Sequence, residues 1–148
     1  MSGVEIPDAQ EAELVLAALV TAFPGWIGDF LESVAVADIY DPRVRRVVEH
    51  AGDAGSRSVQ PTEGETVVDA QVRAMSQRAD VDRRWLAEVV DEWACLGRRT
   101  ILGPAIAEAA RRRRVMAVAR DIYRGAGSLG AADLAAVVRE LASVAGAR

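Results

Sequence analysis

The stretch from Ile101 to Arg124 constrains the fold more than any other part of the chain, because its apolar residues recur at helical spacing. Val115, Val118 and Ile122 are separated by three and four residues, which places them on one face of a helix. A glycine-rich turn follows this stretch, and a second apolar stripe at the same spacing runs toward the end of the chain. Two such helices joined by a short turn predict a C-terminal helical hairpin.

The rest of the chain also predicts helices. Five earlier segments carry apolar residues at helical spacing, and none shows a convincing strand pattern. We therefore expect an all-α protein, with a compact helical body of about five helices over residues 1–97 and the hairpin over residues 98–148, packed as one domain unit. The five segments are residues 9–23, 26–34, 42–51, 62–78 and 81–96.

Helix ends and inward-facing positions are predicted as well. Thr62 and Asp80 are expected to begin the fourth and fifth helices as caps. Pro104 predicts that regular helix in the long stretch begins near residue 103. The first helix is apolar on most sides and is expected to be central. The inward-facing positions of the second, third and fourth helices are expected to be Trp26, Ile27, Phe30, Leu31, Val44, Val47, Val48, Val67, Val68, Val72 and Met75.

The charge of the chain is divided by position. Residues 1–96 carry a net charge of −10, residues 97–124 carry +6, and the remaining residues balance. An acidic body joined to one basic helix is compatible with a nucleic-acid face, with contact between two copies, or with neutralisation inside the chain. Every basic residue is Arg. Without Lys, neither a Walker-A phosphate loop nor a Schiff base can form.

Few side chains suit catalysis or metal binding. Because His50 is the only histidine and Cys95 the only cysteine, one chain cannot build a zinc site from these residue types. Glu49 adjoins His50 but points elsewhere on a helix, and no nucleophile motif accompanies them. We therefore expect a non-enzymatic protein without cofactor or metal. The acids of the first two helices are expected mostly on polar sides: Glu11, Glu13, Asp29 and Glu32.

Membrane and export signals are not visible in the sequence. No apolar run reaches the roughly 18 residues of a membrane-spanning helix. The N-terminus is acidic and lacks the basic start of a signal peptide. A lone cysteine also excludes an internal disulfide. These features predict a cytoplasmic protein without a membrane partner.

Four consecutive arginines lie in the middle of the long stretch. Four successive helical residues sweep about 300° around the axis, so their side chains cannot share one surface. Glu108 precedes the first two by three and four residues and can pair with both. The run is compatible with a solvated, ion-paired helix or with a partner surface. It is also compatible with a nucleic-acid face formed by Arg111, Arg112, Arg113 and Arg114.

The hairpin has two alternative roles. If the stripe of its last helix only covers the long helix, the hairpin is an internal scaffold. If part of the stripe stays outside the body, it forms an exposed apolar patch, and such patches normally mark an interface. We favour self-association into a dimer or a higher ring. The expected self-association residues are Val115, Met116, Ile122, Tyr123, Leu134, Val137, Val138 and Leu141.

Two short motifs and the order of the helices carry a family resemblance. The acidic start Glu11-Ala12-Glu13 opens the central apolar helix, and Tyr40-Asp41-Pro42 leads into the third helix. Arg113-Arg114-Val115-Met116 then runs through the long helix toward the final one. In this layout nearly the whole chain resembles the N-terminal domain of DnaB-type replicative DNA helicases, as a divergent, free-standing or excised copy.

The resemblance implies a helical domain that self-associates through its hairpin and helps dock the primase. The family's usual Phe and His are replaced here by Ile39 and Val44, and its P-loop ATPase domain is missing from the sequence. The expected function is therefore non-enzymatic oligomerisation in helicase–primase assembly, with a primase or helicase as partner. The alternative is a nucleic-acid-binding or regulatory helical protein that uses the Arg111–Arg114 helix.

Overall fold

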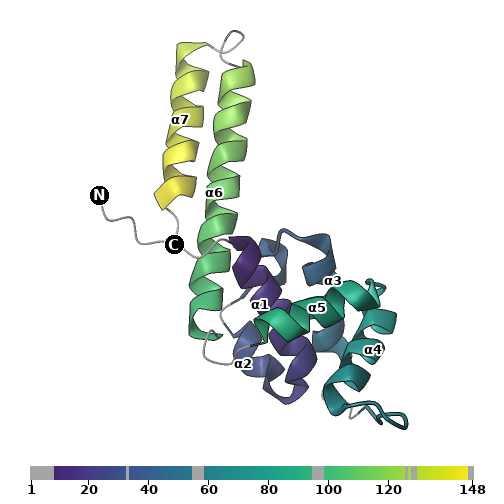
Figure 1. Cartoon of the computed structure of the whole chain (residues 1–148). Coiled ribbons are helices and arrows are strands. Elements are labelled where there is room, and N and C mark those ends of the chain that lie inside the picture. Colours follow the sequence, from purple (N-terminus) through teal and green to yellow (C-terminus); the bar gives the residue numbers. More distant parts are fainter. Residues whose placement is uncertain are drawn as a thin grey trace. The chain divides into compact units, whose positions relative to one another are not determined.

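The computed structural model describes residues 9–32, 34–54, 59–94, 99–125, 127 and 130–146 (Figure 1). Every regular element in these ranges is helical, which confirms the predicted all-α fold class. The α-helices are α1 Ala9–Ala22, α2 Ile27–Leu31, α3 Pro42–Ala54, α4 Val67–Ala79, α5 Arg83–Trp93, α6 Arg99–Gly125 and α7 Ala131–Gly146, with short 3-10 turns at Pro24–Trp26 and Val36–Asp38.

Two compact units divide the chain. The first ends at Ala107 and the second begins at Glu108, so the boundary lies inside α6. The sequence pattern instead predicted a boundary after residue 97. Leu102 and Ile106 explain the difference, because both are buried in the core of the first unit and bring the first turns of α6 into it.

Helix α1 is the centre of the first unit, as predicted. It contacts α2, α3, α4 and α5 (Figure 1). Burial of a Val or Leu side chain contributes about 1.5–3 kcal/mol, so the many buried side chains of α1 make it the main source of stability in this unit. These side chains are Ala12, Val15, Leu16, Ala17, Ala18, Leu19 and Val20.

The predicted inward faces of α3 and α4 are confirmed in part. Val44, Val47 and Val48 on α3 are buried, as are Phe30 on α2 and Val72 and Met75 on α4. Three other predictions were wrong. Trp26, which lies in a 3-10 turn, is exposed, and so are Val67 and Val68, which lie in the first turn of α4.

The start of α4 lies later than the sequence predicted. Thr66 is the N-cap, and its hydroxyl accepts a hydrogen bond from the backbone N–H of Asp69 at 3.1 Å. Thr62 was the predicted cap. It does pair with Glu65, because its N–H donates to that carboxylate at 3.1 Å, but the pair closes a turn ahead of the helix.

Glu65 also fastens this turn to α4. Its carboxylate accepts hydrogen bonds from the Arg73 guanidinium at 3.0 and 3.1 Å. These bonds, followed by the N–H of Thr62, lower the pKa of Glu65 from 4.5 to about 2. The carboxylate therefore stays ionised over the whole neutral and mildly acidic range.

The caps between α4 and α5 were also assigned wrongly from the sequence. Asp82 is the N-cap of α5, and its carboxylate accepts from the Trp85 N–H at 2.8 Å. Asp80 instead ends α4 with a left-handed backbone, φ 52°. Such conformations are tolerated by Asp more readily than by most residues.

Helix α6 begins at Arg99, earlier than Pro104 predicted. A proline within the second turn removes one backbone hydrogen bond, and the burial of Leu102, Ala105 and Ile106 around it offsets that loss. The single long helix predicted from the sequence is therefore confirmed, with its start shifted.

Among the described residues, no single helix is long and apolar enough to span a membrane. The bent pair Gln10–Ala22 and Pro24–Leu31 passes that test by length and composition only.

Candidate self-association surface

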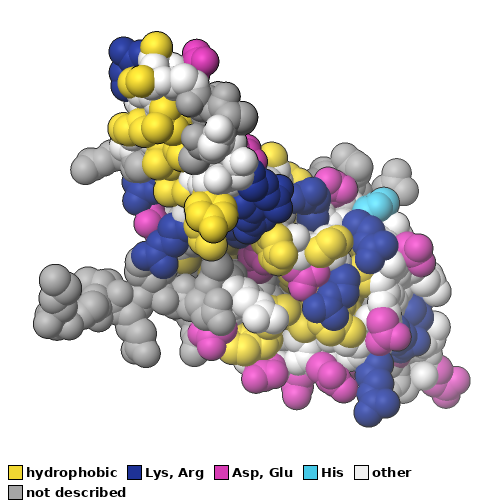
Figure 2. Space-filling view, turned by 90° about the horizontal axis from the view of Figure 1, so that it is seen from above, with side chains coloured by type: hydrophobic (Ala, Val, Ile, Leu, Met, Phe, Trp, Pro, Cys, Tyr) yellow, Lys and Arg dark blue, Asp and Glu magenta, His cyan; other side chains and the backbone are white. Residues whose placement is uncertain are grey.

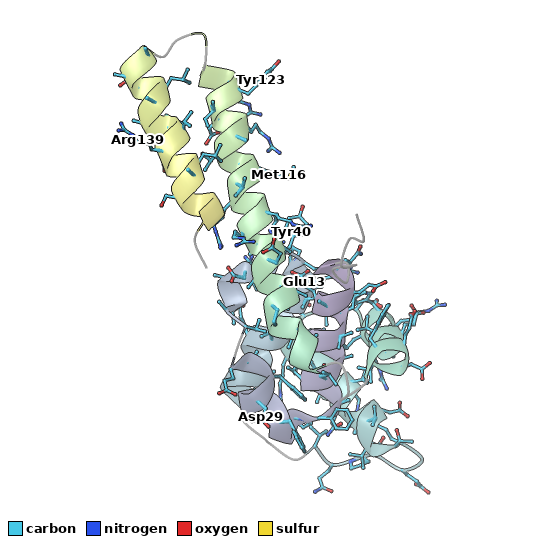
Figure 3. The ribbon with its side chains drawn as sticks, turned by 90° about the vertical axis from the view of Figure 1, so that its left-hand side faces the viewer. Glu13, Asp29, Tyr40, Met116, Tyr123 and Arg139 are labelled. Atoms are coloured by element: carbon cyan, nitrogen blue, oxygen red, sulfur yellow. The ribbon has the colours of Figure 1, made fainter. Side chains whose placement is uncertain are left out.

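The second unit is a helical hairpin. Its part of α6 and α7 lie side by side and run in opposite directions (Figures 1 and 3). Each of the two helices carries apolar residues spaced by three and four, the repeat that is typical of coiled coils. All of them remain half-buried. We call this set the seam: Val115, Val118 and Ile122 on α6, and Leu134, Val137 and Leu141 on α7.

Three large apolar side chains lie outside the seam. Met116 is 62% exposed, Tyr123 86% and Val138 51%. Figure 3 shows Met116 and Tyr123 projecting from the same side of α6, and Figure 2 shows hydrophobic side chains gathered along the hairpin. A soluble surface rarely exposes several large apolar groups together unless they contact something.

The eight residues predicted for self-association thus fall into two sets. Val115, Ile122, Leu134, Val137 and Leu141 belong to the seam and are half-buried. The remaining three are the exposed residues Met116, Tyr123 and Val138. The distinction between these two sets could not be made from helical spacing alone, because both occur at steps of three and four.

The four arginines fan around α6, as their consecutive positions predicted. Arg111 and Arg113 are half-buried, and Arg112 and Arg114 are exposed. Glu108 forms ion pairs with Arg111 and, at 3.4 Å, with Arg112. The hydrogen bond from Arg111 is the main reason that the pKa of Glu108 lies below its ordinary value. These pairs compete with any phosphate that the first two guanidiniums could bind.

A shallow groove of about 300 Å³ follows this part of α6. The groove is lined by the ion-paired charged groups and by the first apolar residues of the hairpin. The lining residues are Glu108, Arg111, Arg112, Val115 and Met116.

A buried carboxylate in the first unit was missed by the sequence analysis. Glu13 was expected on a polar side of its helix, but it is only 3% exposed. Its carboxylate accepts hydrogen bonds from the backbone N–H of Tyr40 and, at 3.2 Å, from that of Asp41. Glu13 therefore links α1 to the segment that leads into α3.

The Ile39–Tyr40 peptide group is held from both ends. Its N–H donates to Glu13, and its carbonyl accepts from the Arg45 guanidinium at 2.5 Å. The negative charge therefore lies at the N–H and the positive charge at the carbonyl, which matches the dipole of the peptide. The Ile39 side chain is fully buried in the core, whereas Tyr40 is 69% exposed.

Asp41 closes the start of α3. Its carboxylate accepts from the backbone N–H of Arg43 at 2.8 Å and pairs with the Arg43 guanidinium at 3.0 Å. Burial alone would raise the pKa of Asp41, but the hydrogen bonds from Arg43 outweigh it and lower the pKa. The same guanidinium lies 4.4 Å from the centre of the Trp85 ring, which adds a cation–π contact between α3 and α5.

One sequence signal could have revealed Glu13. A helix that is apolar on most sides has little polar side to offer, so an acid near its middle must be buried and needs donors. The donors are backbone N–H groups more than 25 residues away in sequence. Helical spacing contains no information about them.

His50 and Cys95 are the residues considered for catalysis or metal binding. His50 lies on α3 and is half-buried. Cys95 lies outside the described residues. Within the described ranges, no group of three or more His, Cys, Asp or Glu side chains is placed to hold a metal ion.

No protein-family model matches the chain, and neither the curated proteins nor the solved structures gave a match.

Proposed function

We propose that this protein is a non-enzymatic interaction domain that self-associates through its C-terminal hairpin. One observation carries the proposal: the hairpin is a two-helix unit whose seam stays half-buried while Met116, Tyr123 and Val138 are exposed. Two helices alone cannot cover an apolar stripe on all sides, so further helices are needed to remove it from water. A second copy of the hairpin supplies them.

The resemblance to the N-terminal domain of DnaB-type helicases supports a role in helicase–primase assembly. Its two short motifs meet in the first unit, because Glu13 of the acidic start accepts from Tyr40 and Asp41 of the second motif. Both motifs therefore contribute to the fold of the first unit. The expected partners are a primase or a helicase, bound by the self-associated form.

Self-association is tested by replacing both Met116 and Val138 with Glu, because these two apolar side chains are exposed on the hairpin. At about 50 μM, above the micromolar dissociation constant expected of a small interface, the unmodified chain should sediment as a dimer or larger ring. The double variant should sediment as a monomer, because two charges per copy would enter the apolar contact. Sedimentation velocity measures the mass, and circular dichroism checks that the helical content remains.

Ser143→Glu is the matched control on α7, since Ser143 is exposed and polar. It should leave the mass unchanged. A monomeric unmodified chain at the same concentration would refute self-association. An unchanged mass in the double variant would instead place Met116 and Val138 outside the contact between copies.

The replication role has a separate test. The purified chain is mixed with the DnaB-type helicase and with the primase of the same genome, and each mixture is sedimented. We expect a faster boundary that contains the chain and at least one partner. If neither protein shifts the chain, the helicase–primase assignment is wrong, while self-association is unaffected.

A further inference from the structure

The arginines of α6 differ in whether an acidic side chain already neutralises them. Arg111 and Arg112 form ion pairs with the Glu108 carboxylate. Arg120 and Arg124 lie at least two turns farther along the helix, and both are exposed. Among the described residues, no acidic side chain forms an ion pair with either of them. These two guanidiniums can therefore bind an anionic partner without first losing an internal ion pair.

Helical geometry places the exposed arginines in one row. Arg124 follows Arg120 by four residues and Arg113 precedes it by seven, and each step returns to nearly the same side of a helix. Val118 and Ile122 of the seam are each two residues from Arg120, which corresponds to about 160° around the axis. The row and the seam therefore lie on opposite sides of α6. We call the row the arginine stripe: Arg113, Arg120 and Arg124.

The charge of the second unit favours an anionic ligand. Residues 108–148 contain eight Arg and four acidic residues, so their net charge is +4 at neutral pH. The whole chain carries −4, so residues 1–107 carry −8. An anionic ligand is therefore attracted to the hairpin and repelled by the first unit.

An exposed aromatic ring borders the arginine stripe. Tyr123 is 86% exposed and projects from α6 (Figure 3). It lies about 60° around the helix from Arg120, on the side away from Asp121. An arginine guanidinium donates paired hydrogen bonds to a phosphate, and a tyrosine ring stacks on a nucleic-acid base. Arginines beside an exposed ring therefore suit a ligand that carries both phosphates and unstacked bases.

We infer that the arginine stripe and Tyr123 bind a single-stranded nucleic acid, through its phosphates and one stacked base. In a duplex the bases are paired and stacked inside, whereas a single strand presents them to an exposed ring. An acidic protein or an anionic membrane offers negative charge without a base to stack. Binding is independent of base sequence, because neither phosphate contacts nor stacking read the edge of a base.

This site is separate from the proposed contact between copies. It assigns Tyr123 to the nucleic acid and leaves Met116 and Val138 to self-association. Met116 lies seven residues before Tyr123, which is about 10 Å along the helix axis. The arginine stripe and Tyr123 all belong to one helix of one copy. A monomeric chain would therefore remove the proposed self-association and leave this inference in place.

Fluorescence anisotropy of a labelled oligothymidylate tests the inference with the full chain. At about 50 mM salt we expect a dissociation constant below about 100 μM, the weak end of non-specific binding. Replacing both Arg120 and Arg124 with Ala should raise it by on the order of 10-fold and reduce its salt slope by about 1.4, because two phosphate contacts are lost. The matched control replaces Arg46 and Arg139, two exposed arginines outside the stripe, and should change it by less than about 3-fold.

Tyr123 provides a second comparison. Tyr123→Ala should raise the dissociation constant by about 10-fold through the loss of one stacked base, and Tyr123→Phe should leave it within about 2-fold because the ring remains. Circular dichroism and sedimentation velocity should show the same helical content and mass for every variant.

Four results would overturn the inference. These are no binding of the single strand at about 50 mM salt, equal losses in the arginine pair and its control, no effect of Tyr123→Ala, and tighter binding of a duplex of the same length. A chain that binds vesicles of anionic lipid more tightly than the strand would also overturn it, because the stripe would then be a membrane site.

Discussion

Replacing Glu13 with Ala should lower the free energy of unfolding of the first unit by about 3–5 kcal/mol. The carboxylate is buried and accepts from the N–H groups of Tyr40 and Asp41. A hydrogen bond to a charged group contributes about 1.5–3 kcal/mol, and alanine leaves both donors without this acceptor. The Arg45 guanidinium on the same peptide also loses the opposite charge that lies across from it.

Urea unfolding followed by circular dichroism measures this effect. Glu13→Gln should cost less, about 1–2 kcal/mol, because its amide oxygen can still accept while its NH₂ group faces donors. Glu11→Ala is the matched control on the same helix. Glu11 is exposed, so its loss should change stability by less than about 0.5 kcal/mol. A Glu13→Ala protein as stable as the Glu11→Ala protein would show that the buried contacts contribute nothing.

A chain that ends after residue 97 should be less stable than one that ends after Ala110 by about 4–6 kcal/mol. The shorter chain lacks Leu102, Ala105 and Ile106, which are buried in the core of the first unit. Their apolar partners on the other helices would become exposed to water. The longer chain keeps these three side chains and lacks the hairpin.

The two truncated chains are compared by urea unfolding at equal concentration. The double variant Leu102→Ala with Ile106→Ala in the full chain is the control, and it should lose a comparable free energy, about 4–8 kcal/mol, through the cavities left behind. Equal stability of the two truncated chains would place the boundary at residue 97, as the sequence pattern predicted. Unequal stability places it inside α6.

Much of the fold follows from periodicity. The spacing of Val44, Val47 and Val48 predicted the buried face of α3, and these residues are buried. The long α6, the turn after it and α7 were predicted in the same way. The caps were less predictable, because Asp80 and Asp82 are equally suitable residues and only the backbone path decides which one precedes a helix.

The sequence predicted the residues of the candidate surface, but not which of them are exposed. Spacing placed Val137 and Val138 together in one stripe, although the first belongs to the half-buried seam and the second is exposed. Their difference arises from the position of the neighbouring helix, which covers one and not the other. Which apolar residues of the hairpin are exposed therefore depends on the antiparallel arrangement of α6 and α7.

The amino-acid sequence by itself determined the fold class, the approximate helices and the terminal hairpin, because these depend on local spacing and on turn residues. The tertiary structure decided that Glu13 is buried, that Leu102 and Ile106 belong to the first unit, and that Met116 and Tyr123 stay exposed. Burial depends on every neighbour that packs around a residue. Such neighbours come from distant parts of the chain, and helical periodicity describes only one helix at a time.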